Sequence, residues 1–352
     1  MKMQSKKAFE NLKEYCGHHG VDYELNVSLK SFSVFKTGGI ALIVLFPRCI
    51  SNLVLIFQYL VANEIRFKLV GETSNLLFLD DVEFGCLLVT TGVNSIVLNS
   101  SSGTLEVDAG FSLPELARFA LLNSIKGFEG FEGIPGSVGG AVFMNAGAYG
   151  YEVKDVLKGV DVLDADLGEY YLPVRELKFN NRSSVFREAS GKSIVILKAY
   201  FRVEYSDSKK IYKNMSLFHS KRHKYQEFMY PTLGSLYSGS VYRSLARRNV
   251  FYKIMSFLYF LIFYKLKLFM REAPNDRILF NSITINMFKI CYTIQPFSDK
   301  DMNTLTNRGQ HTDEFLRYIE QMESLVGDDL RVENEIVADF NFLRSPPHPA
   351  SG

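Results

Sequence analysis

Two stretches of the chain, Ser51–Asn63 and Asp313–Val326, have apolar residues at helical spacing. Because this spacing collects apolar side chains on one face, both stretches are predicted to form amphipathic helices. The stripes consist of Leu53, Ile56, Phe57 and Leu60 in the first stretch and of Phe315, Leu316, Ile319, Met322 and Leu325 in the second. A further helix is predicted to begin after Ser112, since Ser112 and Glu115 form a capping-box pattern around Pro114.

Alternating apolar and polar positions predict strands in the first 205 residues. Thr104–Ala109 is one example, because its apolar side chains fall on every second position. Phe32–Phe46 is predicted to form two strands joined by a turn at Gly38-Gly39. Further strands are predicted over residues 67–70, 160–163, 170–172 and 194–205. Short strands mixed with helices are typical of an α+β fold.

The pattern changes after Ser206. A helix is predicted over Lys210–Gln226, and Phe251–Met270 is then strongly apolar, although lysines interrupt it. The uncharged core of that stretch, Ile254–Tyr264, has 11 residues, short of the ~20 that a membrane-spanning helix needs. We therefore expect a buried or partner-facing helix and no stable membrane insertion, with association at a membrane surface as the alternative. The Pro-rich tail, residues 345–352, is expected to be disordered.

Composition and charge limit the partners. The 352 residues are 47% hydrophobic, enough for a sizeable core, and the formal net charge is +2. No nucleic acid partner is expected, because binding to a phosphate backbone needs a clustered basic surface. The short basic cluster Lys221–Lys224 is expected to be a solvated helix face. The four cysteines form no C-x-x-C pair and the N-terminus has no secretory signal pattern, so we expect a cytoplasmic protein with reduced thiols and no metal site.

The segment Gly130–Gly150 is dense in glycine and other small residues. Such glycines let backbone N–H groups approach a bound group that a Cβ would block, and the pyrophosphate of a dinucleotide is a natural guest. A second loop of this kind, Gly71–Asn75, follows a predicted strand. The chain contains neither G-x-G-x-x-G nor G-x-x-x-x-G-K-[ST]. A glycine-rich turn system between packed elements would explain the same composition.

Residues Glu132–Ala141 and Met144–Gly150 closely resemble the signature of the UDP-N-acetylmuramate dehydrogenase (UDP-N-acetylenolpyruvoylglucosamine reductase) family. Other segments resemble further parts of that family in the same order: Phe35–Gly39, Gly71–Leu77, Phe179–Phe186, Gly234-Ser235 and Glu333–Ile336. The resemblance covers most of the chain, with a weak zone from about Ser240 to Asn303.

The resemblance implies an FAD-binding domain of the vanillyl-alcohol-oxidase (PCMH) type in two lobes, expected over residues 1–90 and 91–207. A smaller α+β substrate-binding domain is expected over residues 208–344, with an apolar divergent stretch at 240–303. The implied cofactor is FAD and the co-substrate is NADPH. The implied substrate is UDP-N-acetylglucosamine enolpyruvate, which is reduced to UDP-N-acetylmuramate in cytoplasmic peptidoglycan precursor synthesis. A monomer is expected.

The resemblance also implies the site residues. Arg182 would stabilise the substrate carboxylate as negative charge develops, and Ser235 would give a proton to C2. Glu335 would contact the far side of the carboxylate, which requires a raised pKa. The residues expected at FAD are Gly71, Glu72, Thr73, Ser74, Asn75, Leu76, Gly133, Ile134, Pro135, Gly136, Ser137, Gly139, Gly140, Asn145 and Gly147.

Three departures from the family pattern affect the expected contacts. Asn181 stands where the family usually has tyrosine before the arginine. Glu72 and Thr73 replace glycine in the pyrophosphate loop, and a carboxylate there repels a pyrophosphate unless it points away or binds ribose hydroxyls. Leu236–Gly239 replaces a Phe-Lys-Asn-Pro type of sequence, so a lysine expected near the substrate diphosphate is missing.

Two other functions fit part of the pattern. One is a flavin-dependent sugar oxidase of the same domain type, although an oxidase needs no proton donor such as Ser235. The other is a non-catalytic flavin- or nucleotide-sugar-binding protein in which the altered loops have lost turnover.

Overall fold

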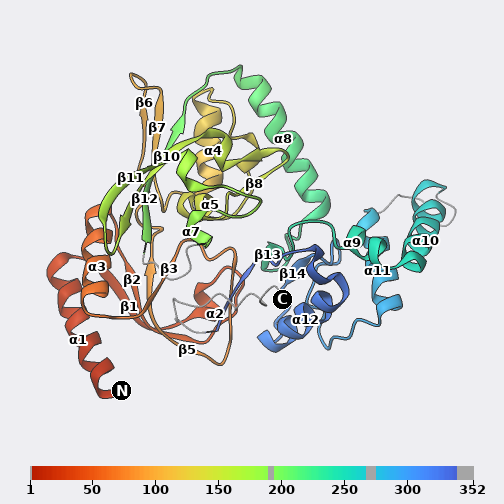
Figure 1. Cartoon of the computed structure of the whole chain (residues 1–352), viewed down its shortest axis with the longest axis horizontal. Helices are drawn as coiled ribbons and strands as arrows, with labels where there is room; N and C mark the ends of the chain where they lie inside the picture. Colours follow the sequence, from red (N-terminus) through yellow and green to blue (C-terminus); the bar gives the residue numbers. More distant parts are fainter. Residues whose placement is uncertain (1, 189–193, 267–274, 339–352) are drawn as a thin grey trace, which may run out of the picture.

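The computed structural model describes residues 2–188, 194–266 and 275–338, and this part of the chain has two larger β-sheets, three two-stranded ones and a helical third part (Figure 1). The first sheet has the strand order β1-β2-β5-β3, formed by Asp22–Ser28, Ile40–Phe46, Glu83–Val89 and Phe67–Val70. β2, β5 and β3 run parallel, and a helix lies on the connection from β2 to β3. α1 (Lys2–His19) and α3 (Ile50–Ala62) belong to this part, and α3 buries its predicted apolar stripe.

The prediction of two strands within Phe32–Phe46 is wrong for the first of them. The single helical turn α2 (Leu29–Phe32) and a loop occupy that position, and only β2 is a strand. β2 pairs antiparallel with β1 instead. The side chains of β1 are almost all exposed, although Tyr23, Leu25 and Val27 alternate with polar residues in the pattern that indicates a strand, and this strand lies outside the predicted ones.

The second sheet is antiparallel and has the order β11-β10-β12-β7-β6, formed by Gly168–Pro173, Leu157–Asp164, Ile194–Arg202, Thr104–Asp108 and Ile96–Asn99. These strands confirm the predictions for residues 104–109, 160–163, 170–172 and 194–205. α4 (Leu113–Leu122) and α5 (Val138–Phe143) pack against the sheet around one apolar core.

α4 begins after Ser112 as predicted, but the capping box is wrong. Among the described residues, the Ser112 side chain makes no capping hydrogen bond. The N–H group of Leu113 donates instead to the carbonyl of Gly136, at 2.8 Å. The glycine-rich segment therefore lies against the start of α4 and satisfies one of its free donors.

α8 (Ser208–Tyr225) leads from the second sheet to the helical third part (Figure 1). That part contains the strand pair β13 (Thr232–Ser235) and β14 (Thr304–Thr306). Its helices are α9 (Val241–Arg248), α10 (Val250–Tyr259), the π-helical turn Phe260–Lys265, α11 (Asp276–Phe288) and α12 (Thr312–Val326). α12 confirms its prediction and buries Phe315, Ile319 and Met322.

The chain finally returns to the first part. β15 (Glu335–Val337) pairs in parallel with β4 (Leu76–Phe78), directly after the loop Gly71–Asn75. The remaining elements are short: β8 (Gly147–Ala148), β9 (Tyr151–Glu152), α6 (Val153–Val156) and α7 (Val185–Glu188), with 3-10 turns at Glu129–Phe131, Val174–Leu177 and Gly327–Asp329. The predicted disordered tail lies outside the described residues. In the described part of the chain, no helix is long and apolar enough to cross a membrane.

Candidate active site

The two glycine-rich loops, far apart in the sequence, contact each other. The carboxylate of Glu72 accepts a hydrogen bond from the backbone N–H of Gly136 at 2.9 Å. The Ser74 hydroxyl donates to the carbonyl of Pro135, also at 2.9 Å. Glu72, a departure from the family pattern, is thus held by the opposite loop. Its negatively charged carboxylate is stabilised by a backbone N–H group of that loop.

Glycine is required where these loops meet. A Cβ at Gly71 would lie 2.3 Å from the Ser137 hydroxyl oxygen, and one at Gly139 would lie 3.0 Å from the Cβ of Ala109. Gly133 and Gly136 have φ angles of +75° and +138°, which favour glycine. Bare backbone at close approach, together with serine hydroxyls, fits the phosphates of a dinucleotide such as FAD.

Three residues expected at FAD have side chains committed to protein contacts. The Thr73 hydroxyl accepts from the N–H of Val34 at 3.0 Å, and the Asn75 amide donates to the carbonyl of Glu333 at 3.0 Å. The buried Asn145 amide donates to the carbonyl of Asn180 at 3.0 Å. These side chains fix the loops and the turn that carries Arg182, which leaves backbone atoms as their possible contacts to a cofactor.

Arg182 projects from a tight turn. The turn is closed by a bridge between Asn180 and Ser183, and Arg182 itself has a left-handed φ of +53°. Its Nη2 donates to the carbonyl of Gly147 at 2.9 Å. The structure therefore brings the predicted arginine against the glycine-rich segment, while the neighbouring Asn181 is exposed.

The carboxylate that meets Arg182 belongs to Glu333. Arg182 Nε lies 3.4 Å from Glu333 Oε1, and the Glu333 side chain is 15% exposed. Burial raises the pKa of the Glu333 carboxyl above its ordinary value, although the charges of Arg182 and Arg187 oppose that shift. Arg187 is half-buried and donates to the carbonyl of Arg182 at 2.7 Å and to that of Glu333 at 3.3 Å.

Glu335, the glutamate expected from the sequence, lies elsewhere. Its carboxylate pairs with Lys68 of β3, and its side chain is 42% exposed. Its N–H donates to the carbonyl of Asn75 at 2.9 Å. The segment Glu333-Asn334-Glu335 offered two carboxylates, and only the contact with Arg182 distinguishes them.

Ser235 lies in a segment next to Glu333. It is exposed at the end of β13 and pairs with Thr304 of β14. The N–H of Glu333 donates to the carbonyl of Leu236 at 2.7 Å. The Asn334 amide donates both to the carbonyl of Leu233, at 3.1 Å, and to Asn75 Oδ1, at 2.9 Å. Asn334 thereby connects the Gly71–Asn75 loop, the Glu333 segment and the strand that carries Ser235.

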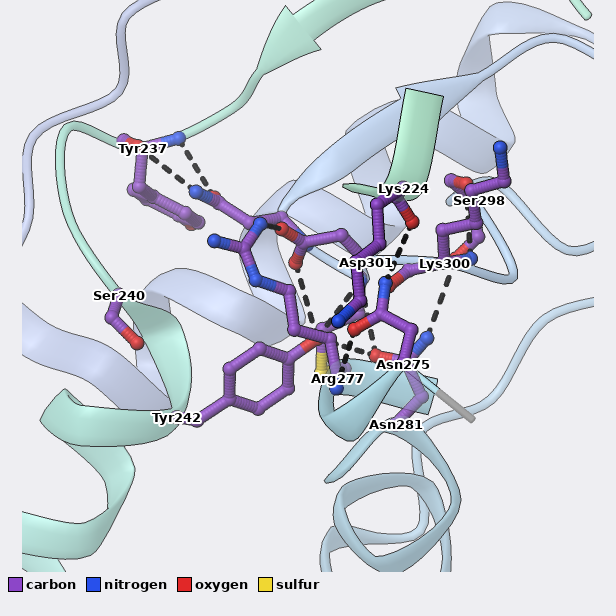
Figure 2. A network of polar contacts seen from close by, with 12 residues as sticks. Lys224, Tyr237, Ser240, Tyr242, Asn275, Arg277, Asn281, Ser298, Lys300 and Asp301 are labelled. Carbon is purple, nitrogen blue, oxygen red and sulfur yellow. Dashed lines mark hydrogen bonds and ion pairs between the residues drawn. The ribbon is translucent and has the colours of Figure 1, made fainter. Parts of the chain in front are cut away.

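A buried polar network anchors the chain that follows Ser235 (Figure 2). Tyr237 exchanges backbone hydrogen bonds of 2.9 and 3.0 Å with the Asn303 side chain. Nearby, Asp301 pairs with Arg277 of α11 and accepts from the hydroxyl of Tyr242 of α9 at 3.1 Å. Because Leu236 and Tyr237 are also buried, core packing fills the place where the family pattern expects a lysine.

Arg222 was missed by sequence reasoning. Lys221, His223 and Lys224 are exposed as predicted, but Arg222 is buried, and its Nη2 donates to the carbonyl of Gly130 at 2.9 Å. A Cβ at Gly133 would lie 3.1 Å from Arg222 Cδ. The sequence signal for its burial was helical spacing, because Arg222 continues the buried stripe of Ile211, Met215 and Phe218.

Comparison with known proteins identifies relatives of this chain. Residues 41–170, which include both glycine-rich loops, match the model of an FAD binding domain family. The UDP-N-acetylenolpyruvoylglucosamine reductase of Caldicellulosiruptor saccharolyticus is 33% identical over 219 residues, 62% of this chain and 69% of that protein. The reductase of Lactobacillus johnsonii is 36% identical over 219 residues, 62% of this chain and 71% of that protein.

The chain belongs to the UDP-N-acetylenolpyruvoylglucosamine reductase family. A crystal structure of this reductase from Thermus caldophilus has the same fold, with a TM-score of 0.65 and 21% identity over 90% of this chain and 98% of that chain. The family relationship makes this chain an FAD-dependent oxidoreductase with an α+β FAD-binding fold, as the sequence predicted.

Proposed function

We propose that this member of the reductase family catalyses the NADPH-dependent reduction of UDP-N-acetylglucosamine enolpyruvate to UDP-N-acetylmuramate. The observation that carries the proposal is the contact of Arg182 with a buried carboxyl group, Glu333, beside the strand that ends in Ser235. The names of the relatives, which specify this reduction, support the same substrate. Cytoplasmic peptidoglycan precursor synthesis, a monomeric state and the division at residues 90 and 207 are part of the proposal.

Arg182 binds the carboxylate of the enolpyruvyl group. FAD, when bound, would supply the redox chemistry, the transfer of a hydride from NADPH to C3 of that group. Hydride addition at C3 drives negative charge toward the carboxylate. The guanidinium of Arg182 uses one N–H toward Gly147 and one toward Glu333, and its remaining donors form a planar fork that matches the developing dianion.

Ser235 gives the proton to C2. Its hydroxyl is exposed at the end of β13, and the strand around it is held by Asn303 and Asn334. A serine hydroxyl is a weak acid, so its effect depends on fixed geometry at short range to the carbon that it protonates. The hydrogen bonds on both sides of Ser235 support such fixed geometry.

Glu333 has the role that the family resemblance implied for Glu335. A raised pKa favours the protonated carboxyl group, which can donate a hydrogen bond to the substrate carboxylate. The same carboxyl group orients the Arg182 guanidinium. Glu335 instead pairs with Lys68 and helps to hold the C-terminal segment to the first sheet.

The backbone of both glycine-rich loops holds FAD. The proposed contacts are the residues expected from the sequence, with Thr73, Asn75 and Asn145 acting through their backbone or by fixing the loops. Glu72 stabilises the contact between the loops rather than a phosphate, because its carboxylate already accepts from Gly136.

The test is an anaerobic measurement of the two half-reactions. In Ser235→Ala, we expect NADPH to reduce the flavin at the normal rate, while reoxidation by the enolpyruvyl substrate slows by roughly 10²- to 10⁴-fold. Ser238→Ala, a change in the same segment, serves as the matched control with both rates preserved. Equal losses in the two half-reactions of Ser235→Ala would remove Ser235 as the proton donor.

The same measurement separates the alternatives. Reduction of the flavin by a sugar alone, followed by consumption of oxygen, would replace the proposed function with that of an oxidase. A bound flavin that NADPH never reduces would point to a binding protein without turnover.

A further inference from the structure

Helix α10 turns its hydroxyl groups toward the protein and its large apolar side chains outward, and Lys253 is exposed as well. Its buried residues are Tyr252 and Ser256. The Tyr252 hydroxyl makes a 2.8 Å hydrogen bond with the hydroxyl of Thr284 on α11, and the Ser256 hydroxyl donates to the carbonyl of Tyr252. The hydroxyl groups on the protein-facing side of α10 therefore already have hydrogen-bond partners within the chain.

The outward side of α10 forms one continuous apolar surface, here called the α10 face. It consists of Val250, Phe251, Ile254, Phe257 and Leu258, which are 69%, 64%, 52%, 63% and 43% exposed. Spacings of three, four and seven residues put these side chains on one side of the helix. Surface helices of globular proteins normally show the opposite arrangement, with charged and polar residues outward.

Cations surround the α10 face. A shallow cavity at the junction of α9 and α10, about 470 Å³ in volume, is lined by Arg243, Ala246, Arg247, Val250 and Lys253. Lys265 is exposed just beyond α10. The sequence between residues 228 and 271 contains seven lysines and arginines and no aspartate or glutamate, although the whole chain has 38 acidic residues against 40 basic ones. The positive charge here is therefore a local feature.

We propose that the α10 face docks on the surface of a bilayer that contains anionic phospholipid. The apolar side chains enter the boundary between headgroups and acyl chains, and Arg243, Arg247 and Lys253 contact lipid phosphates. The helix lies in the plane of the surface, because α10 has 10 residues and none of the described helices can cross a membrane. α10 lies at the far end of the molecule from the two sheets, so docking leaves the glycine-rich loops accessible (Figure 1).

The charges favour a bilayer over a second copy of the chain. In a symmetric dimer the same patch meets itself, so the cations of α9 and α10 would face identical cations. Like charges brought together in this way oppose association. An anionic lipid surface offers phosphates to the cations and acyl chains to the apolar residues at the same time.

The chain has no tryptophan, so Phe257→Trp introduces a single fluorescent reporter into the α10 face. With phosphatidylglycerol-containing vesicles, we expect a blue shift of its emission and quenching by brominated lipid. Both effects should weaken as salt increases, and both should be absent with pure phosphatidylcholine vesicles. Leu167→Trp, at a 70% exposed site outside this patch, is the matched reporter that should not respond.

Vesicle flotation of the full chain gives the second measurement. The pair Phe251→Ser and Phe257→Ser, and separately the triple change Arg243→Gln, Arg247→Gln and Lys253→Gln, should each reduce binding roughly ten-fold or more. The matched controls are Leu122→Ser with Leu167→Ser, and the triple change Lys209→Gln, Lys210→Gln and Lys213→Gln, all at exposed sites elsewhere. The controls should bind vesicles like the unchanged protein.

Three results would overturn the proposal. The first is no binding to anionic vesicles and no response of Phe257→Trp. The second is binding that the α10 variants reduce no more than their matched controls do. The third is a dimer that Phe257→Ser dissociates, without vesicle binding, which would assign the α10 face to a second copy of the chain.

Discussion

The proposed active site and helix α10 differ in where their polar and apolar groups lie. At the proposed site, Asn334 is buried, Arg182 and Glu333 are partly buried, and each has partners from distant segments of the same chain. On α10, hydroxyl groups face the protein and large apolar side chains face outward. The polar groups of the proposed site thus have partners within the chain, whereas the α10 face is an exposed apolar surface of the kind that marks interaction sites.

The two regions also lie apart in the molecule (Figure 1). Changes at the site should therefore alter turnover and leave vesicle binding intact, while changes on the α10 face should do the reverse.

The largest effect is expected from a comparison of two phenylalanines. Phe315 of α12 is fully buried with its ring 4.8 Å from that of Phe35, whereas Phe257 of α10 is 63% exposed. Phe315→Ala should lower the free energy of unfolding by ~3–5 kcal/mol, because it leaves a cavity in the core. Phe257→Ala should change it by no more than ~0.5 kcal/mol. Urea unfolding measures both, and a large loss in Phe257→Ala would mean that α10 is packed rather than exposed.

Arg182→Lys tests the catalytic geometry. An ammonium group cannot reproduce the planar fork of a guanidinium, so reoxidation of the flavin by the enolpyruvyl substrate should slow by about 10²- to 10³-fold. Reduction by NADPH and binding to anionic vesicles should stay unchanged. Stopped-flow absorbance and flotation provide the two readouts. Normal reoxidation in this variant would exclude Arg182 from the site.

Substitutions of Glu333 and Glu335 test which glutamate serves the reaction. Glu333→Ala should slow reoxidation by roughly 10²-fold, because it removes both the hydrogen-bond donor to the substrate carboxylate and the contact with Arg182, whereas Glu333→Gln keeps a neutral donor and should lose less. Glu335→Ala and Glu335→Gln should change the rate only slightly, since the partner of Glu335 is Lys68. The reverse order of effects would restore the assignment of Glu335.

Asn334→Ala tests the connection between the three site segments. The change leaves the carbonyl of Leu233 without its hydrogen bond and removes the contact to Asn75, which should cost ~1–3 kcal/mol of stability. Reoxidation of the flavin by the enolpyruvyl substrate should slow more than its reduction by NADPH, because Ser235 and Glu333 are no longer held in a fixed position relative to each other. If both half-reactions slowed to the same extent, Asn334 would have a structural role without a positioning role.

The smallest effect concerns the pH dependence of stability. Native Glu333 has a pKa above the ordinary 4.5, so between these two values the native state binds more protons than the unfolded state. Its contribution to stability is therefore present at low pH and is lost as the pH rises from 4.5 through the native pKa. Urea midpoints should fall across this interval more in the unchanged protein than in Glu333→Gln. Identical pH profiles would mean that the pKa of Glu333 is not raised.

Local sequence patterns were sufficient where one element determines its own structure. The apolar stripes of α3 and α12 predicted helices with the correct buried faces, and the alternation at residues 104–109 predicted β7. Contiguous motifs likewise predicted the glycine-rich segment, the loop after β3 and the turn at Arg182. In each case the residues that matter are neighbours in the chain.

Local patterns failed where distant segments decide the outcome. Glu333 and Glu335 are equivalent in sequence, and a contact with an arginine 151 residues away separates them. Arg222 looked like part of a solvated cluster, but the glycine-rich segment covers it. The edge strand β1, by contrast, carried a local signal, since Tyr23, Leu25 and Val27 alternate with polar residues, yet its side chains are almost all exposed.

The sequence by itself determined the family, the glycine-rich loops and most of the elements, because these depend on spacing and on short motifs. The tertiary structure alone decided which carboxyl group meets Arg182 and which side of α10 faces outward. The apolar residues of α10 predicted a buried or partner-facing helix, and spacing could not show that Tyr252 and Ser256 would take the inner side. That choice depends on the hydroxyl of Thr284 on α11, a partner that only the folded chain brings into contact.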